Sequence, residues 1–167
     1  DGELQLQTTD AGLTHRWLTQ LPGVPRDLAA AKVAGEATFK ARWTGGWQDQ
    51  GKAISVTARV QVPRLDWAEA GAPDSATWRL RDAQVDVSGT PAAMVLTTQA
   101  KAENKTQRLR LEAKAQGGRG AGGSWSAQID STRLTVQDTR RPGVWTAQLA
   151  DPVAVLWKQT AATQTLE

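Results

Sequence analysis

The chain has 167 residues, of which 40% are hydrophobic and 22% are charged, and its net charge is +3. These numbers indicate a single folded domain, globular or elongated, and argue against intrinsic disorder. Because the chain contains no Cys and one His, its composition excludes a disulfide scaffold, a thiolate metal site and a cysteine nucleophile. The small excess of positive charge indicates solubility more than nucleic-acid binding.

The start of the chain indicates that it is part of a longer polypeptide. It begins at Asp1, without Met and without a signal peptide, directly in the alternating residues 2–7. No run approaches the roughly 20 apolar residues of a membrane helix, and the most apolar stretch, 153–157, has the length of a strand. We therefore expect one soluble segment, 1–167, with any targeting or anchoring sequence outside it.

A helix is expected only near the N-terminus. Apolar residues there recur at helical spacing, Asp10 is a suitable N-cap, and Pro22 ends the run. These features predict an amphipathic helix at about 11–21, and a second helical turn is expected at Asp27–Ala31. The apolar stripe of the first helix consists of Leu13, Trp17, Leu18 and Leu21.

From residue 33 to residue 158, apolar and polar residues alternate with a period of two, which is typical of β-strands. In one clear example, Val56 and Val60 share one face of a strand while Arg59 and Gln61 share the other. An antiparallel sheet with a single apolar side has this pattern. The predicted strands lie at 33–43, 54–62, 78–88, 94–98, 108–115, 125–130, 134–136, 145–149 and 153–157.

A sheet of this size has to cover its apolar face or curl around it. It can fold into a two-layer sandwich or barrel, or it can form a half-pipe with the apolar side inward and the helix at one end. Many inward positions are Ala, a thin lining for a dry sandwich core. We therefore predict an all-β fold with one short helix, in which an elongated, curled antiparallel sheet has an apolar concave face.

The sequence offers no catalytic constellation. His15 lies in the predicted helix without a Ser or a carboxylate at the spacing of a triad. The Gly-rich residues 117–123 are followed by a strand pattern and not by a helix with Lys-Ser/Thr, so they do not form a phosphate loop. Nucleic-acid binding is also disfavoured, because alternation sends Trp78 and Arg79 to opposite faces. We expect neither an enzyme nor a metal or cofactor.

The eight Trp, beside one Phe and no Tyr, leave two interpretations open. Indole rings can pack in a core, or they can line or rim a cavity for an apolar ligand with their N–H groups at a wet edge.

Short motifs recur along the chain, most clearly in its C-terminal third. They are SWSAQID (124–130), LTV (134–136) and GVWTAQLADPV (143–153), with further short motifs at 17–22, 35–37, 45–47 and 65–67. These stretches resemble the TamB family, in which a strand that opens with Trp is followed by a strand with a Trp, Leu and Pro pattern. The spacing from Trp145 to Leu149 is looser here than the usual form, and the Cys pair often found beyond it is absent.

The resemblance implies a function without catalysis. Proteins of the TamB and AsmA-like type are anchored in the inner membrane of Gram-negative bacteria and extend through the periplasm as a long β-taco with an apolar trough. They are associated with phospholipid transport to the outer membrane and with insertion of outer-membrane proteins beside a barrel partner, TamA. The resemblance therefore implies phospholipid, a barrel partner and neighbouring segments of the same chain as binding partners.

We expect the trough lining to consist of the larger apolar residues on the inward face. A scaffold or chaperone that holds β-barrel precursors by strand addition is an alternative, as is a closed sandwich that binds partner proteins. The predicted lining residues are Val33, Phe39, Ile54, Val56, Val60, Trp78, Leu80, Val85, Val87, Leu109, Leu111, Trp125, Ile129, Leu134, Trp145 and Leu149.

Overall fold

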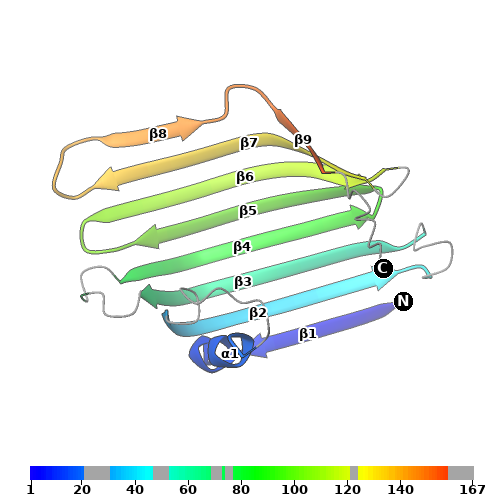
Figure 1. Ribbon diagram of the computed structural model, residues 1–167, viewed down its shortest axis with the longest axis horizontal. Helices are drawn as coiled ribbons and strands as arrows, with labels where there is room; N and C mark the ends of the chain where they lie inside the picture. Colours follow the sequence, from blue (N-terminus) through cyan, green and yellow to red (C-terminus); the bar gives the residue numbers. More distant parts are fainter. Residues whose placement is uncertain (21–30, 47–52, 69–72, 74–76, 121–123, 158–167) are drawn as a thin grey trace, which may run out of the picture.

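A computed structural model describes residues 1–20, 31–46, 53–68, 73, 77–120 and 124–157. Within these residues the chain forms nine strands and one helix (Figure 1). In chain order they are β1 (Gly2–Thr8), α1 (Ala11–Leu18), β2 (Lys32–Thr44), β3 (Ser55–Ala68), β4 (Trp78–Thr90), β5 (Ala93–Glu103), β6 (Gln107–Arg119), β7 (Trp125–Asp138), β8 (Val144–Gln148) and β9 (Val153–Trp157).

All nine strands belong to one antiparallel sheet in the order β1-β2-β3-β4-β5-β6-β7-β8, and β9 pairs with β7 beyond the end of β8. Each strand from β1 to β8 thus lies beside its neighbour in sequence (Figure 1). The edge strands do not pair with each other, so the sheet is open. The prediction of a nearly all-β, open antiparallel sheet is confirmed, and a closed sandwich or barrel is not what the chain forms. The sheet starts earlier than the expected residue 33, because β1 pairs with β2 along its whole length.

The sheet is a single layer. Only four apolar side chains are buried among the described residues, namely those of Ala11, Ala31, Ala41 and Ile54. The chain exposes 12446 Å², whereas a compact monomer of this mass exposes about 8,000 Å². The apolar side of the sheet is therefore covered neither by a second sheet nor by the described helix.

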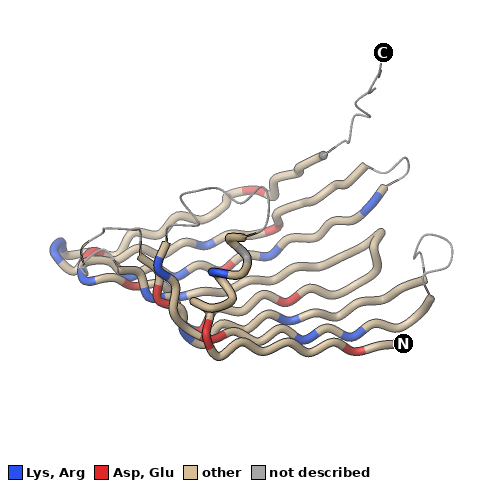
Figure 2. The backbone as a smooth tube through the Cα atoms, turned by 60° about the horizontal axis from the view of Figure 1, so that its bottom comes forward, with Lys and Arg blue, Asp and Glu red and all other residues tan. Residues whose placement is uncertain are grey.

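Three irregularities interrupt the regular alternation. In β3, Val62 and Pro63 lie opposite the single residue Ala37 of β2, and in the neighbouring strand β4 an extra residue, Asp82, has a φ of 49°. A third lies in β7 at Asp130. Such bulges bend a strand and increase its twist. They accompany the curl of the sheet, which Figure 2 shows from its lower edge.

Pro63 at such a point is physically reasonable, because a proline cannot donate to the ladder and is tolerated in sheets at bulges. Nearby, Gly35 of β2 lies opposite Leu65 with a φ of 146°. A Cβ atom at Gly35 would lie 2.2 Å from the carbonyl oxygen of Arg64. The close approach of the two strands beside the bulge thus requires glycine.

Helix α1 is shorter than the predicted 11–21. Asp10 is its N-cap, as expected, and accepts a 3.0 Å hydrogen bond from the amide of Leu13. The helix contacts β2, but Leu13 and Trp17 are both 61% exposed. Leu13 and Trp17 therefore do not pack against the sheet as a plug. The expected turn at 27–31 lies almost entirely outside the described residues.

Candidate functional site

One face of the sheet is apolar across its full width. Residues that pair between neighbouring strands lie on the same face, and one row of such pairs contains only apolar side chains in all eight positions. This row runs through Leu4, Ala41, Ala58, Val87, Leu96, Ala115, Ile129 and Val153. We call it the central apolar row, and the face that bears it the apolar face.

The rows on either side extend the apolar face along the strands. Toward one end the next row is Leu6, Phe39, Val60, Val85, Thr98, Ala113 and Thr132. Beyond the bulges, a further row contains Gly35, Leu65, Leu80, Ala102, Leu109, Val136 and Trp145. The few hydroxyl groups on this face are those of threonines, and the paired positions of these rows contain no charged residue.

Most of the predicted lining residues share the apolar face. The pairing register places Val33, Phe39, Val56, Val60, Trp78, Leu80, Val85, Val87, Leu109, Leu111, Trp125, Ile129, Leu134 and Trp145 there. The other two lie just outside the strands. Ile54 precedes β3 and is only 2% exposed, so it fills the start of the strand, and Leu149 follows β8, where its amide donates a 3.0 Å hydrogen bond to the carbonyl oxygen of Thr132.

Several members of the apolar face lie outside the predicted lining. The alternation in the predicted strands already places most of them on the apolar side, namely Trp43, Val62, Met94, Leu96, Val136, Val153 and Val155, and Leu4 and Leu6 alternate in the same way in β1. Sequence reasoning misses Leu65 and Trp67, because the bulge before Arg64 inserts an extra residue and reverses the phase of alternation in β3.

The apolar face is open to solvent. Leu6 is 56% exposed and Trp145 is 73% exposed. Near the other end of the strands, Val87, Met94, Leu96, Trp125 and Val155 line a hollow of about 260 Å³. This volume is below the roughly 300–1,000 Å³ of pockets for drug-sized ligands. The face is therefore a shallow open surface and not a closed pocket.

The described Trp side chains differ in their burial. Trp67 and Trp78 lie directly opposite each other in β3 and β4 and are partly buried. Trp43 lies over Gly2, where a Cβ atom would approach its ring within 2.2 Å. These three pack against the sheet, whereas Trp125 and Trp145 are 40% and 73% exposed.

The opposite face is charged. Four cations lie side by side on adjacent strands, because Arg64, Arg81, Lys101 and Arg110 are successive partners in the register from β3 to β6. Like charges directly opposite each other destabilise a sheet.

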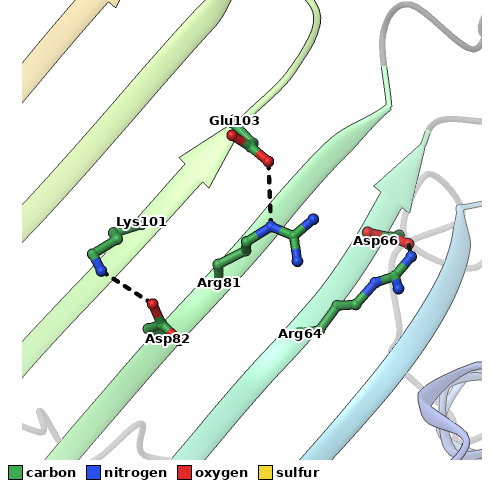
Figure 3. A network of polar contacts seen from close by, with 6 residues as sticks. All are labelled: Arg64, Asp66, Arg81, Asp82, Lys101 and Glu103. Carbon is green, nitrogen blue, oxygen red and sulfur yellow. Dashed lines mark hydrogen bonds and ion pairs between the residues drawn. The ribbon is translucent and has the colours of Figure 1, made fainter.

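Each of these cations has a carboxylate close by, and Figure 3 shows three of the pairs. The ion pairs are Arg64 with Asp66 at 2.7 Å, Arg81 with Glu103 at 3.2 Å, Lys101 with Asp82 at 3.0 Å and Arg110 with Glu112 at 2.6 Å.

Asp86 is the most constrained acid on the charged face. Gln84 donates a side-chain hydrogen bond to one carboxylate oxygen and Arg59 donates to the other. These two contacts, the bond from Gln84 being the larger effect, hold the pKa of Asp86 below its ordinary value. The carboxylate is therefore ionised at neutral pH and joins Gln84 of its own strand to Arg59 of β3.

The charged face also has hollows, and they are larger than the one on the apolar face. One of about 520 Å³ includes Gln84, Asp86, Lys114 and Arg133 in its wall. A second of about 520 Å³ includes Arg79, Arg81, Lys101 and Arg108. The hollows of the curled sheet are thus not confined to its apolar side.

In the part of the chain that the structure describes, no group of three or more His, Asp or Glu side chains could hold a metal ion. The Gly-rich stretch is not a single loop, because β6 continues through Gly117 and Gly118 to Arg119. A Cβ atom at Gly118 would lie 2.2 Å from the carbonyl oxygen of Ala92. This glycine therefore permits the β4–β5 turn to lie against β6.

Among the described helices, none has both the length and the apolar character needed to cross a membrane. No family model matches the chain, and neither does any curated protein or any solved structure.

Proposed function

We propose that the chain is one segment of a conduit that shields the acyl chains of phospholipids from water. The observation that supports this function is the central apolar row, which is unbroken across the sheet and lies on a face without a covering layer. An uncovered apolar surface of this extent on a folded chain usually marks a ligand or partner site.

The dimensions of the apolar face suit a lipid tail. The sheet has eight strand positions, since β8 and β9 share the position beside β7, and a spacing of about 4.8 Å makes it about 34 Å wide. If β8 and β9 occupied separate positions, the nine strands side by side would be roughly 40 Å wide. It exceeds the roughly 15 Å depth of one bilayer leaflet. A lipid tail thus fits along the row, while a longer path requires further segments.

The chemistry of the face suits transport more than tight binding. Each methylene moved out of water contributes about 0.8 kcal/mol, so a tail of about 16 carbons needs on the order of 12 kcal/mol of apolar shielding. Ala, Val, Leu and Trp side chains provide such shielding without a polar group that would hold the tail at one position. The Arg, Lys, Gln and Asp residues of the other face keep the outer surface hydrated.

The resemblance to the TamB family suggests the setting. In this proposal the segment belongs to a periplasmic chain anchored in the inner membrane, neighbouring segments pair with the open edges at β1 and at β8 and β9, and an outer-membrane barrel of the TamA type receives the far end. An exposed sheet edge offers unpaired backbone groups for such strand addition.

The test compares two adjacent residues of β3 on opposite faces. Val60→Asp places a carboxylate on the apolar face, whereas Gln61→Asp makes the same change in charge on the charged face. We expect purified wild type and Gln61→Asp to retain phospholipid detected by mass spectrometry after denaturing extraction, and Val60→Asp to lose it while keeping its β-sheet circular dichroism. Equal lipid in both variants, or none in the wild type, would contradict the proposal.

A scaffold for outer-membrane β-barrel precursors is the second candidate, and the two open edges of the sheet favour it. In that case the bound material is peptide held by backbone hydrogen bonds. The same extraction then yields peptide instead of phospholipid, and binding is insensitive to Val60→Asp.

A further inference from the structure

The turns at one end of the sheet are basic. At this end, on the left in Figure 1, the β5–β6 turn contains Lys105 and the β7–β8 turn contains Arg140 and Arg141. Figure 2 shows charged residues crowded at the end of the sheet far from the marked termini. At the other end, the β4–β5 turn consists of the uncharged Pro91 and Ala92. Among the turns that the structure describes completely, the two at this end are thus basic and the one at the other end is uncharged.

Hydrogen bonds fix the two basic turns side by side. The amide of Thr139 donates to the carbonyl oxygen of Thr106 at 2.8 Å, and the Thr139 hydroxyl donates to the same oxygen at 3.1 Å. Within the β5–β6 turn, the side chain of Asn104 accepts hydrogen bonds from the amides of Thr106 and Gln107 at 2.9 and 2.7 Å. The backbone that carries Lys105 and Arg140 is therefore held in one arrangement.

The cations of these turns are available to a ligand. Lys105, Arg140 and Arg141 are exposed, and none of them belongs to an ion pair among the described residues. The nearby acid, Asp138, accepts a 2.8 Å hydrogen bond from the amide of Arg140. The two turns thus carry three cations and one carboxylate, which itself stabilises the turn.

The apolar face begins directly beside these cations. Leu109 of β6, Val136 of β7 and Trp145 of β8 are successive partners on the apolar face at this end of the strands. Trp145 is 73% exposed. A cationic rim thus meets an open apolar surface with an indole ring at the boundary, and Trp favours such boundaries between apolar and wet surroundings.

We propose that Lys105, Arg140 and Arg141 form a rim site for the phosphate group of an amphiphile whose alkyl chain lies on the apolar face. This inference rests on the proposed function and specifies the ligand. A guanidinium donates two parallel hydrogen bonds to phosphate oxygens, and an ammonium adds a point charge. Because the basic turns among the described ones lie at this end of the sheet, bound amphiphiles share one orientation, with the phosphate at this rim.

The experiment measures binding of three probes with the same alkyl chain to the 167-residue chain, followed by tryptophan fluorescence below the micelle concentration of each probe. The probes are dodecyl phosphate, dodecylphosphocholine and dodecyl maltoside. The test variant is the triple substitution of Lys105, Arg140 and Arg141 by Gln. The control substitutes Gln for Lys40, Lys114 and Arg133, which are exposed on the charged face and outside the ion pairs found there.

We expect the test variant to bind dodecyl phosphate about tenfold more weakly, which corresponds to about 1.4 kcal/mol, since exposed charge contacts are individually weak and three of them are removed. Its affinity for dodecyl maltoside should change less than about twofold, and the control variant should bind all three probes like the wild type. The wild type should bind dodecyl phosphate more tightly than dodecyl maltoside, and the ratio of the two affinities should decrease as salt is added.

The outcomes separate this site from the proposed function. If dodecyl maltoside binds but the test variant keeps its preference for dodecyl phosphate, the proposed rim site is wrong, while binding of alkyl chains to the apolar face is supported. If dodecyl maltoside does not bind at all, the apolar face does not bind alkyl chains, and both the proposed function and this inference are wrong. If inorganic phosphate displaces dodecyl phosphate at equal concentration, the rim binds free phosphate and not a lipid headgroup, which overturns the inference.

Discussion

The absence of a covering layer predicts an unusually small cost for truncating a central apolar side chain. Leu111 lies near the middle of the apolar face, between Ala100 of β5 and Leu134 of β7, and is only half-buried. Leu111→Ala removes three carbons, worth about 2.4 kcal/mol if fully buried. Because the side chain is already partly exposed and its truncation leaves no closed cavity, we expect a loss of about 1.5–2 kcal/mol in the free energy of unfolding.

Ile54→Ala is the reference for this measurement, because Ile54 is 2% exposed and loses the same number of carbons. Its truncation should cost about 3 kcal/mol, within the range for fully buried side chains that leave a cavity. Urea unfolding followed by far-UV circular dichroism gives both values. If Leu111→Ala costs as much as Ile54→Ala, the apolar face is covered in solution and the single-layer description fails. A cost that rises with protein concentration would identify the cover as a second copy of the chain.

Three further predictions concern single residues. The pKa of Asp86 is lowered by folding, so its carboxylate stabilises the protein above the unfolded-state pKa of about 3.9 and loses this effect as the pH falls through the folded pKa. Asp86→Asn should therefore lower the free energy of unfolding by less than about 1 kcal/mol at pH 7 and leave it unchanged near pH 2, as measured by urea titrations. An equal loss at both pH values would refute this account. Gly35→Ala should destabilise the protein more than Gly143→Ala, because both glycines have positive φ but a Cβ atom at Gly143 meets nothing within 4 Å. Equal unfolding midpoints would show that the clash is relieved. Asp10→Ala should cost helix α1 about 1 kcal/mol, so exchange of the Leu13 amide should accelerate while amides of the sheet stay protected.

The strands and their faces could be predicted from the sequence because alternation is the direct consequence of strand geometry. Val56, Val60, Val85 and Val87 share the apolar face in the structure as their spacing predicts. The number of layers could not be predicted in the same way. A sandwich and an open half-pipe both need one apolar face per strand, and only the small size of the inward residues distinguished them.

The bulges mark a second limit of sequence reasoning. At Asp82 the phase of alternation changes within one strand, and the change alone does not reveal whether a strand ends or bulges. The register shows that β4 continues through it. In helix α1, Leu13 and Trp17 match a buried stripe in spacing, but both are exposed and nothing in the described sheet covers them. Spacing identifies an apolar stripe, but tertiary packing decides whether it is buried.

The strand order β1 to β8 has a consequence for how such a molecule changes in size. Each strand makes its main contacts with its immediate neighbours, as the units of a solenoid do. A closed barrel has a strand number set by its circumference, but this open sheet has no such closure. Duplication of one hairpin would lengthen it by about 10 Å and leave the remaining pairs unchanged. Length in such a protein is therefore a matter of hairpin copy number, adjustable in small steps to whatever distance has to be bridged.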